Sequence, residues 1–190
     1  MGRRRVAKEL REWIEIVVED NADDLLRYLR RRVNHPEDAA DLLGRVLLTL
    51  WENGAKVPTT DEEARMWSFG IARNVVREHY RRNVRRLELA DRLRFRLSTS
   101  TQSASATDGL AEANIRNAEL RRAVMALDES SRELVMLVHW DGFSIASAAR
   151  LLSINDSTAR TRYGRALRRL ERELHNRPSF HEADRPTFAV

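Results

Sequence analysis

The clearest repeat of hydrophobic and polar positions lies between residues 141 and 174, where two helical patterns are separated by four residues. Ser144 can cap a short helix over residues 145–152, whose apolar residues recur at helical spacing. The sequence Ser-Ile-Asn-Asp at residues 153–156 then breaks the repeat and supplies turn and capping chemistry. A longer helix begins near Ser157. This order predicts a helix, a tight turn and a second helix.

The second helix of this motif has two chemically different sides. At 100° per residue, its apolar residues between Ala159 and Leu170 fall on one side. The other side carries Thr158, Thr161, Arg162, Arg165, Arg168 and Arg169. Arginine reaches guanine edges and phosphates, and threonine makes short polar or methyl contacts, so this side suits the DNA major groove. The alternative is a solvated basic face on an ordinary helix, but the short helix and turn in front favour DNA binding.

The first half of the chain shows helical periodicity and almost no strand signal. We expect helices over residues 8–18, 22–33, 36–52 and 61–84. The residues predicted to face inward in the last of these helices are Trp67, Ile71 and Val75, with Tyr80 as a further candidate. The fold class that follows is all-α.

The helix over residues 36–52 has the best-defined ends. Pro36 lies in its first turn, where Glu37 and Asp38 complement the helix dipole, and Asn53-Gly54 ends it. The inward stripe is Leu42, Leu43, Val46, Leu47 and Leu50. The outward face is Asp41, Gly44, Arg45 and Leu48, with Trp51 at its edge. An outward leucine beside a glycine fits a docking surface, although a lone surface leucine gives the same pattern.

The end of the helix over residues 61–84 becomes densely basic. Residues 72–86 read ARNVVREHYRRNVRR, so arginines surround His79 and Tyr80. Such a surface can hold single-stranded nucleic acid, with phosphates on the arginines and a base stacked on the ring. The alternative is a basic surface helix whose tyrosine completes the core.

A change of composition divides the chain. Residues 98–108 are rich in serine and threonine and poor in apolar residues, which predicts a flexible linker. The second half is expected to begin with a helix over residues 111–127, and Ser130 and Glu133 then stand at capping-box spacing for the next helix. The predicted segments are a first helical domain (1–97), a linker (98–110), a second domain with the helix-turn-helix (111–176) and a disordered tail (177–190).

Composition narrows the partners. The sequence pI near 10.3 points to an acidic partner, with nucleic acid before a membrane surface. No cysteine is present, which fits a reducing compartment. No apolar run approaches the length of a membrane span, and the basic N-terminus lacks the apolar segment of a signal peptide. We therefore expect a cytoplasmic protein with no membrane insertion.

Signals for catalysis are missing from the sequence. The five histidines show no metal-ligand spacing, and there is no glycine-rich phosphate loop or nucleophile elbow. The acidic residues occur in first turns and on exposed faces. We expect no catalytic residue, no metal site and no cofactor.

Two helical domains, each with a basic helix and joined by a Ser/Thr-rich linker, resemble the extracytoplasmic-function (ECF) group of bacterial sigma factors, which consist of sigma domains two and four. The resemblance covers about residues 21–176. In the first domain it rests on HPEDAADLLGRVLLTLW and MWSFGIARNVVREHYRR, and in the second on LRRAVMALDESSRELVMLVHWDGFSIASAARLL and STARTRYGRALRRL. The order and spacing of these stretches are more specific than any one of them.

The resemblance implies three sets of binding residues. The set that would dock on core RNA polymerase is Asp38, Asp41, Leu42, Gly44, Arg45, Leu48 and Trp51. The set that would open and hold the promoter −10 element, with the loop before Trp67, is Arg73, Asn74, Arg77, Tyr80, Arg81 and Arg82. The set that would read the −35 element is Ser157, Thr158, Arg160, Thr161, Arg162, Arg165, Arg168 and Arg169. Core RNA polymerase and promoter DNA are the implied partners, and an anti-sigma factor is a further candidate.

The sequence also departs from the family pattern. Gly44-Arg45 stands where Gln-Glu is usual, and Leu47 stands where an aromatic residue is usual. In the second domain, Ser147-Ala148 replaces Glu-Ile, and Ser153 replaces the glycine of the turn. A non-glycine residue at that turn costs roughly 1 kcal/mol if its φ is positive.

Two other functions fit parts of the sequence. One is a stand-alone helix-turn-helix regulator, although such proteins usually dimerise to match two half-sites. The other is an interaction protein that binds a regulator or polymerase without initiating transcription. A second basic domain with a docking face argues against the simple regulator, because a DNA reader alone does not need one.

Overall fold

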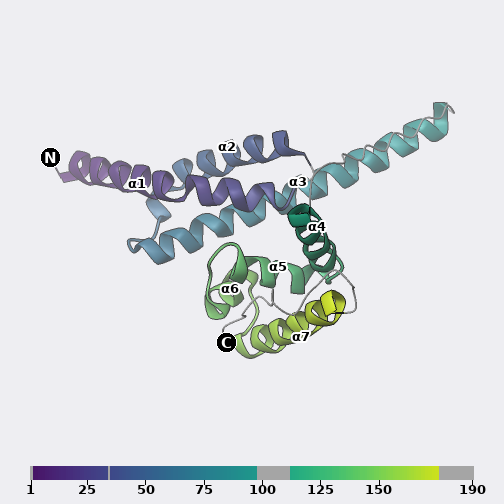
Figure 1. Ribbon diagram of the computed structural model, residues 1–190. Helices are drawn as coiled ribbons and strands as arrows, with labels where there is room; N and C mark the ends of the chain where they lie inside the picture. Colours follow the sequence, from purple (N-terminus) through teal and green to yellow (C-terminus); the bar gives the residue numbers. More distant parts are fainter. Residues whose placement is uncertain (1, 34, 98–111, 176–190) are drawn as a thin grey trace. The chain divides into compact units, whose positions relative to one another are not determined.

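The computed structural model describes residues 2–33, 35–97 and 112–175, and these residues contain helices and no strand. The elements are α1 (Gly2–Arg30), α2 (Pro36–Glu52), the 3₁₀ turn η1 (Gly54–Lys56), α3 (Asp61–Leu97), α4 (Glu112–Met125), α5 (Glu129–His139), α6 (Ile145–Leu152) and α7 (Asp156–His175) (Figure 1). Contacts divide the chain into two compact units, residues 1–102 and 103–190. The all-α prediction is confirmed. The predicted linker (98–110) and tail (177–190) lie outside the described residues.

The first unit is built by α1, α2 and α3, each of which contacts the other two. Its largest fully buried side chains include Tyr28 and Phe69, whose rings meet edge to face with centroids 5.3 Å apart. Leu25, Val46 and Leu50 complete this centre from α1 and α2. Burial of one aromatic or leucine side chain stabilises a fold by about 1.5–3 kcal/mol, so these residues hold the three helices together.

Helix α1 is one continuous helix, so the prediction of two helices over residues 8–18 and 22–33 was wrong. The polar stretch between them contains Asn21, which is buried in the structure. Its Nδ2 donates to the carbonyl oxygen of Val17 at 2.8 Å, and its Oδ1 accepts from Arg65 at 3.4 Å. Because its polar atoms are paired within and across helices, the stretch continues as helix; it contains no glycine or proline to end it.

The buried face of α3 also differs from the prediction. Trp67, Ile71 and Val75 are only partly buried, and Tyr80 is 43% exposed. The residues that face the core are Ala64, Ser68, Phe69, Ala72 and Val76. The small side chains of Ala64, Ser68 and Ala72 let α3 approach its neighbours closely. A search of the sequence for large apolar residues does not detect these three positions. The helix also continues past the expected end near residue 84, to Leu97, because no glycine or proline interrupts it.

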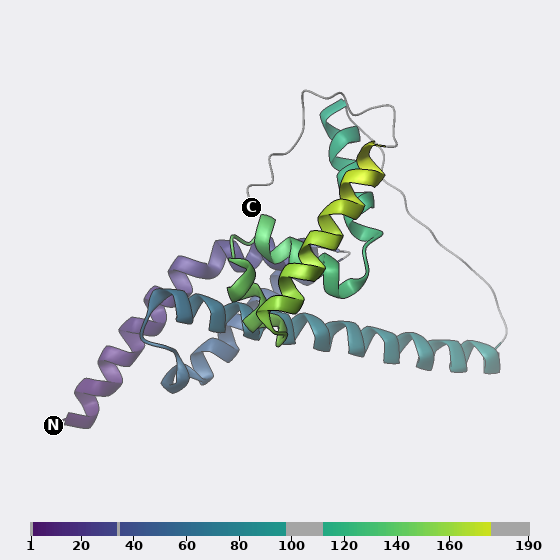
Figure 2. The same ribbon diagram turned by 90° about the horizontal axis from the view of Figure 1, so that it is seen from below.

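The second unit consists of α4 to α7, with α7 in contact with each of the other three. Figure 2 shows α7 running beside α4. Its core contains Val124 of α4, Val135 of α5 and Ala166 and Leu170 of α7. Ser144 caps α6 by accepting from the backbone N–H of Ser147 at 3.0 Å. The helix-turn-helix predicted from the sequence is therefore confirmed.

The start of α5 is capped differently from the prediction of a Ser130–Glu133 capping box. Asp128 is the capping residue, and its carboxylate accepts from the backbone N–H of Ser131 at 3.0 Å. Hydrogen bonding from Ser131 holds the pKa of Asp128 below its usual range. A carboxylate also complements the positive helix end, which a serine hydroxyl cannot do to the same extent.

The turn between α6 and α7 passes through a left-handed residue. Ser153 has φ 57° and ψ 41°, and it is the one non-glycine residue with positive φ in the described part of the chain. Backbone bonds from Ser153 to Arg150 and from Ile154 to Ala149 close the end of α6. The turn thus keeps its geometry although it lacks the glycine that favours it.

Replacing this serine should relieve the strain. We predict that Ser153→Gly raises the free energy of unfolding of the second unit by about 0.5–1 kcal/mol, because glycine occupies the left-handed region without steric cost. Urea unfolding of both proteins, followed by circular dichroism, measures the difference. An unchanged or lower midpoint would show that Ser153 is not strained in solution.

Candidate nucleic-acid interface

The outward side of α7 presents a basic and polar face. Ser157, Thr158, Arg160, Thr161, Arg165, Arg168 and Arg169 are exposed, and Arg162 is half-buried. The opposite side is fixed by Ala159, Ala166 and Leu170, which are buried. Asn155 caps the helix start by accepting from the backbone N–H of Thr158 at 2.8 Å. The structure therefore gathers the whole predicted −35 set on one helix and leaves most of it open to a partner.

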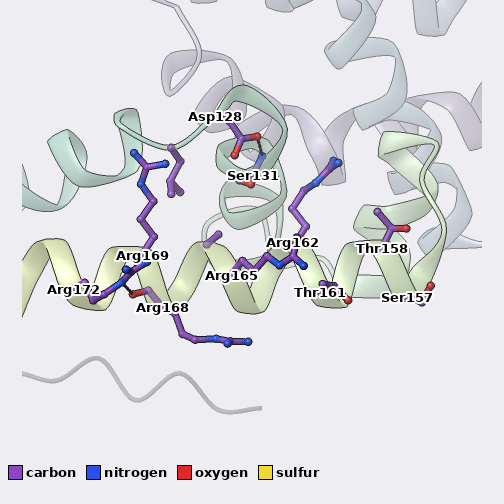
Figure 3. A pocket seen from close by; sticks show the side chains of 12 residues that line it. Asp128, Ser131, Ser157, Thr158, Thr161, Arg162, Arg165, Arg168, Arg169 and Arg172 are labelled. Atoms are coloured by element: carbon purple, nitrogen blue, oxygen red, sulfur yellow. Dashed lines mark hydrogen bonds between the residues drawn. The ribbon is translucent and has the colours of Figure 1, made fainter.

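This face borders an open hollow between α7 and the start of α5. Figure 3 shows Arg162 and Arg169 extending from α7 toward the side where Asp128 lies, and Arg168 pointing away. Five arginines line the hollow, namely Arg162, Arg165, Arg168, Arg169 and Arg172. Such a density of guanidinium groups attracts an anionic partner and can contact several phosphates.

A pair of rings fixes α7 against α5. The hydroxyl of Tyr163 lies 2.7 Å from Nε2 of His139, and the two rings are stacked with centroids 5.7 Å apart. Burial lowers the pKa of His139 and raises the pKa of Tyr163, so both shifts favour the neutral pair. The sequence pattern placed Tyr163 on the apolar side of the helix, and its partner, 24 positions away, carried no signal in the sequence.

A second basic surface lies on α3 in the first unit. Asn74, Arg77, Arg81 and Arg82 are exposed and Arg73 is half-buried. Tyr80 is anchored, because its hydroxyl donates to the carbonyl oxygen of Arg32. The ring is 43% exposed and therefore remains open to contact. The predicted −10 set thus lies on one helix of the first unit. The predicted −35 set lies on a helix of the second unit.

The residues of the predicted docking set on α2 are exposed or half-buried, with one exception. Leu48 and Trp51 are 57% and 49% exposed, and Asp41 and Gly44 are also exposed. Asp38 and Arg45 are half-buried, and the carboxylate of Asp38 lies 3.7 Å from Nε2 of His79 on α3. Leu42 was wrongly included in this set.

Leu42 is 2% exposed and belongs to the core stripe with Ala39 and Val46. It lies one residue from Asp41, a rotation of 100° around the helix, which turns it inward. It cannot contact a partner while the first unit is folded.

Two other observations concern the described residues. They contain no group of three or more His, Cys, Asp or Glu side chains that could hold a metal ion. They also contain no helix that is both long and apolar enough to cross a membrane.

Comparisons with known proteins follow the same division of the chain. Residues 17–86 match the model of Sigma-70 region 2, and residues 117–170 match that of Sigma-70, region 4. The RNA polymerase sigma-E factor of Streptomyces coelicolor is 31% identical over 166 residues, which are 84% of this chain and 85% of that protein. The ECF RNA polymerase sigma factor BldN of the same organism is 29% identical over 153 residues, which are 80% of this chain and 57% of BldN.

A solved structure agrees on the fold. The sigma factor RpoE of Bartonella quintana, in complex with the anti-sigma factor NepR, matches with a TM-score of 0.63 and 20% identity. The match covers 89% of this chain and 98% of RpoE.

A helical unit of region 2 type and a helix-turn-helix unit of region 4 type define the sigma-70 class of proteins. Within this class, the chain belongs to the ECF group of RNA polymerase sigma factors. The resemblance inferred from the sequence is confirmed.

The open space around Gly44 gives a prediction about its replacement. A Cβ atom built at this position meets nothing within 4 Å, so the site has room for a side chain. Glycine inside a helix costs roughly 1 kcal/mol relative to alanine, and Gly44→Gln should therefore stabilise the first unit by about 0.5–1 kcal/mol. Melting curves of the two proteins measure the change, and a lower midpoint for the variant would contradict it.

Proposed function

We propose that this protein is a promoter-specificity subunit of RNA polymerase. It binds the core enzyme in the cytoplasm, directs it to promoters by sequence-specific DNA contacts and allows transcription to begin, without catalysis of its own. The observation that carries this proposal is the exposed Arg-Thr face of α7, which the helix-turn-helix and the Tyr163–His139 contact hold in one orientation.

The −35 contact is assigned to α7. The major groove of B-DNA is about 12 Å wide and admits one α-helix, and arginine is the commonest specific partner of guanine there. Arg165 and Thr161 lie one turn apart on the exposed face, and the arginines along the hollow reach phosphates beside it. These residues supply both base contacts and backbone contacts.

The −10 contact is assigned to α3 and the loop before it. Arg77, Arg81 and Arg82 would hold the phosphates of an opened strand, and the exposed ring of Tyr80 would stack on a base. Arg73 and Asn74 extend the same surface toward the helix start.

The docking contact is assigned to α2. Two large apolar side chains, Leu48 and Trp51, stand exposed beside Asp41 and Arg45, a combination that suits a partner interface. Core RNA polymerase is the partner we propose for this face. RpoE was solved in complex with an anti-sigma factor, and we propose an anti-sigma factor as a further partner of this chain.

Co-purification and transcription together test the proposal. The purified chain is mixed with core polymerase, isolated by size, and used to transcribe a library of promoter fragments at physiological salt. We expect one complex that initiates at a defined set of promoters, whereas the chain alone binds the same DNA weakly. Tight, specific binding by the chain alone would favour a stand-alone regulator, and a complex that never initiates would favour an interaction protein.

Gly44→Gln should leave polymerase binding unchanged or improve it.

Arg165 gives a sharper prediction. If it contacts a base edge, Arg165→Ala should weaken promoter binding by the polymerase complex by about 1–3 kcal/mol and flatten the preference at one −35 position. Arg121→Ala, which removes an exposed arginine of α4, serves as the control for net charge. Equal weakening on all sequences would mean that Arg165 contacts phosphate only. Unchanged promoter activity would mean that this face of α7 is a solvated surface that does not bind DNA.

A further inference from the structure

The first part of α1 precedes the tract that matches region 2, which begins at residue 17. This part nevertheless packs against the loop that joins α2 to α3, residues 53–60. Ile14 is buried in one cluster with Val57 of the loop and Ala64 of α3, and the partly buried Leu10 and Trp13 pack on that cluster. A helical segment outside the matched tract therefore shapes a loop inside it.

A directed contact adds to this packing. The indole N–H of Trp13 donates to the carbonyl oxygen of Pro58 at 2.9 Å, in a partly buried setting. The two residues are 45 positions apart, so the bond ties the loop to α1 across the unit. Without Trp13, the carbonyl would have to find another donor or water.

Gly54 shows how closely the loop fits α1. It is buried, and a Cβ atom at this position would lie 2.0 Å from Cδ1 and 3.1 Å from Cγ1 of Ile14. A side chain there forces either Ile14 or the loop to move. The inner side of the loop is thus complementary to one residue of α1.

The outer side of the same loop is exposed and polar. Lys56 and Thr59 are exposed, whereas Gly54 and Val57 face inward. The backbone N–H groups of Lys56 and Val57 are bonded to the carbonyl oxygens of Asn53 and Gly54 at 2.8 and 3.1 Å. On the outer side, Nζ of Lys56 donates to Oδ1 of Asn53 at 3.4 Å in an exposed setting. The loop therefore has a buried inner row and a solvent-exposed outer row that a partner can reach.

We propose that Trp13 and Ile14 are positioning residues for the loop over residues 53–60, and that they set the selection of bases in the −10 element. The inference rests on the proposed function, in which this loop works beside α3. Because α1 packs against Gly54 and Val57 on the inner side of the loop, it fixes the position of Lys56 and Thr59 on the outer side, where they would meet the opened strand. Discrimination at −10 then depends on a segment that precedes the region 2 tract.

The positioning itself is tested on the full chain without polymerase. Trp13→Phe removes the indole donor and keeps an aromatic ring in the cluster. We expect amide hydrogen exchange at Lys56 and Val57 to accelerate about two- to tenfold, the range that the loss of one hydrogen bond gives. Asn21→Ala, which removes other hydrogen bonds of α1, is the stability control and should leave these two amides unchanged.

The effect on selection is tested in the polymerase complex. Open-complex formation is compared on promoters substituted at single −10 or −35 positions. Trp13→Phe should reduce the preference for the best −10 base about two- to tenfold and leave the −35 preferences unchanged, because α7 is in the other unit. Gly54→Ala should act in the same direction, and Gly54→Ala with Ile14→Val should recover part of the loss by removing Cδ1.

Each contrary result has a separate meaning. Unchanged exchange in Trp13→Phe would show that α1 does not hold the loop. Faster exchange with unchanged −10 preferences would show that the loop does not select bases. If the wild-type chain forms no promoter-specific open complex, the proposed function fails and the −10 selection fails with it, while the exchange data still decide whether α1 holds the loop.

Discussion

Small side chains at the helix contacts determine how both units pack. In the first unit, Ala64, Ser68 and Ala72 of α3 are fully buried, and in the second unit Ala148 of α6 and Ala159 of α7 are fully buried. Side chains this small let helix backbones approach closely, so that the larger apolar residues beside them interdigitate. A larger residue at one of these positions would force the helices apart, at a cost of about 1–3 kcal/mol.

Close packing by small residues leaves the long charged side chains for the outer faces. In α7 the buried side contains Ala159 and Ala166, and the arginines stand on the opposite side. In α2 the buried stripe leaves Leu48 and Trp51 exposed beside charged residues. The stability of each unit therefore comes mainly from the apolar side chains between its helices. A substitution on the outer face can alter binding while the fold persists.

The sequence predicted those elements whose ends and faces are fixed by nearby residues. The limits of α6 and its Ser144 cap follow from local chemistry. Of the predicted inward stripe of α2, Leu42, Val46 and Leu50 are buried, whereas Leu43 and Leu47 are only partly buried. The continuity of α1 and the buried face of α3 could not be predicted in this way, because they depend on partners more than 40 positions away, such as Arg65 for Asn21. The exposure of most Arg and Thr side chains on α7 was predicted from periodicity, and their assignment to the −35 element stays a prediction. The contact of Tyr163 with His139 depends on the tertiary fold.

The hydroxyl of Tyr80, bonded to the carbonyl oxygen of Arg32, has a consequence for the cost of recognition. A free tyrosine loses rotamer freedom when a base stacks on it, and immobilising a side chain at an interface costs about 0.5–1.5 kcal/mol. In Tyr80 that freedom is already lost when the first unit folds. In the proposed −10 contact, the ring is therefore preorganised. Binding of the opened strand does not incur the entropy cost of immobilising it, and the affinity for that strand is higher by that amount.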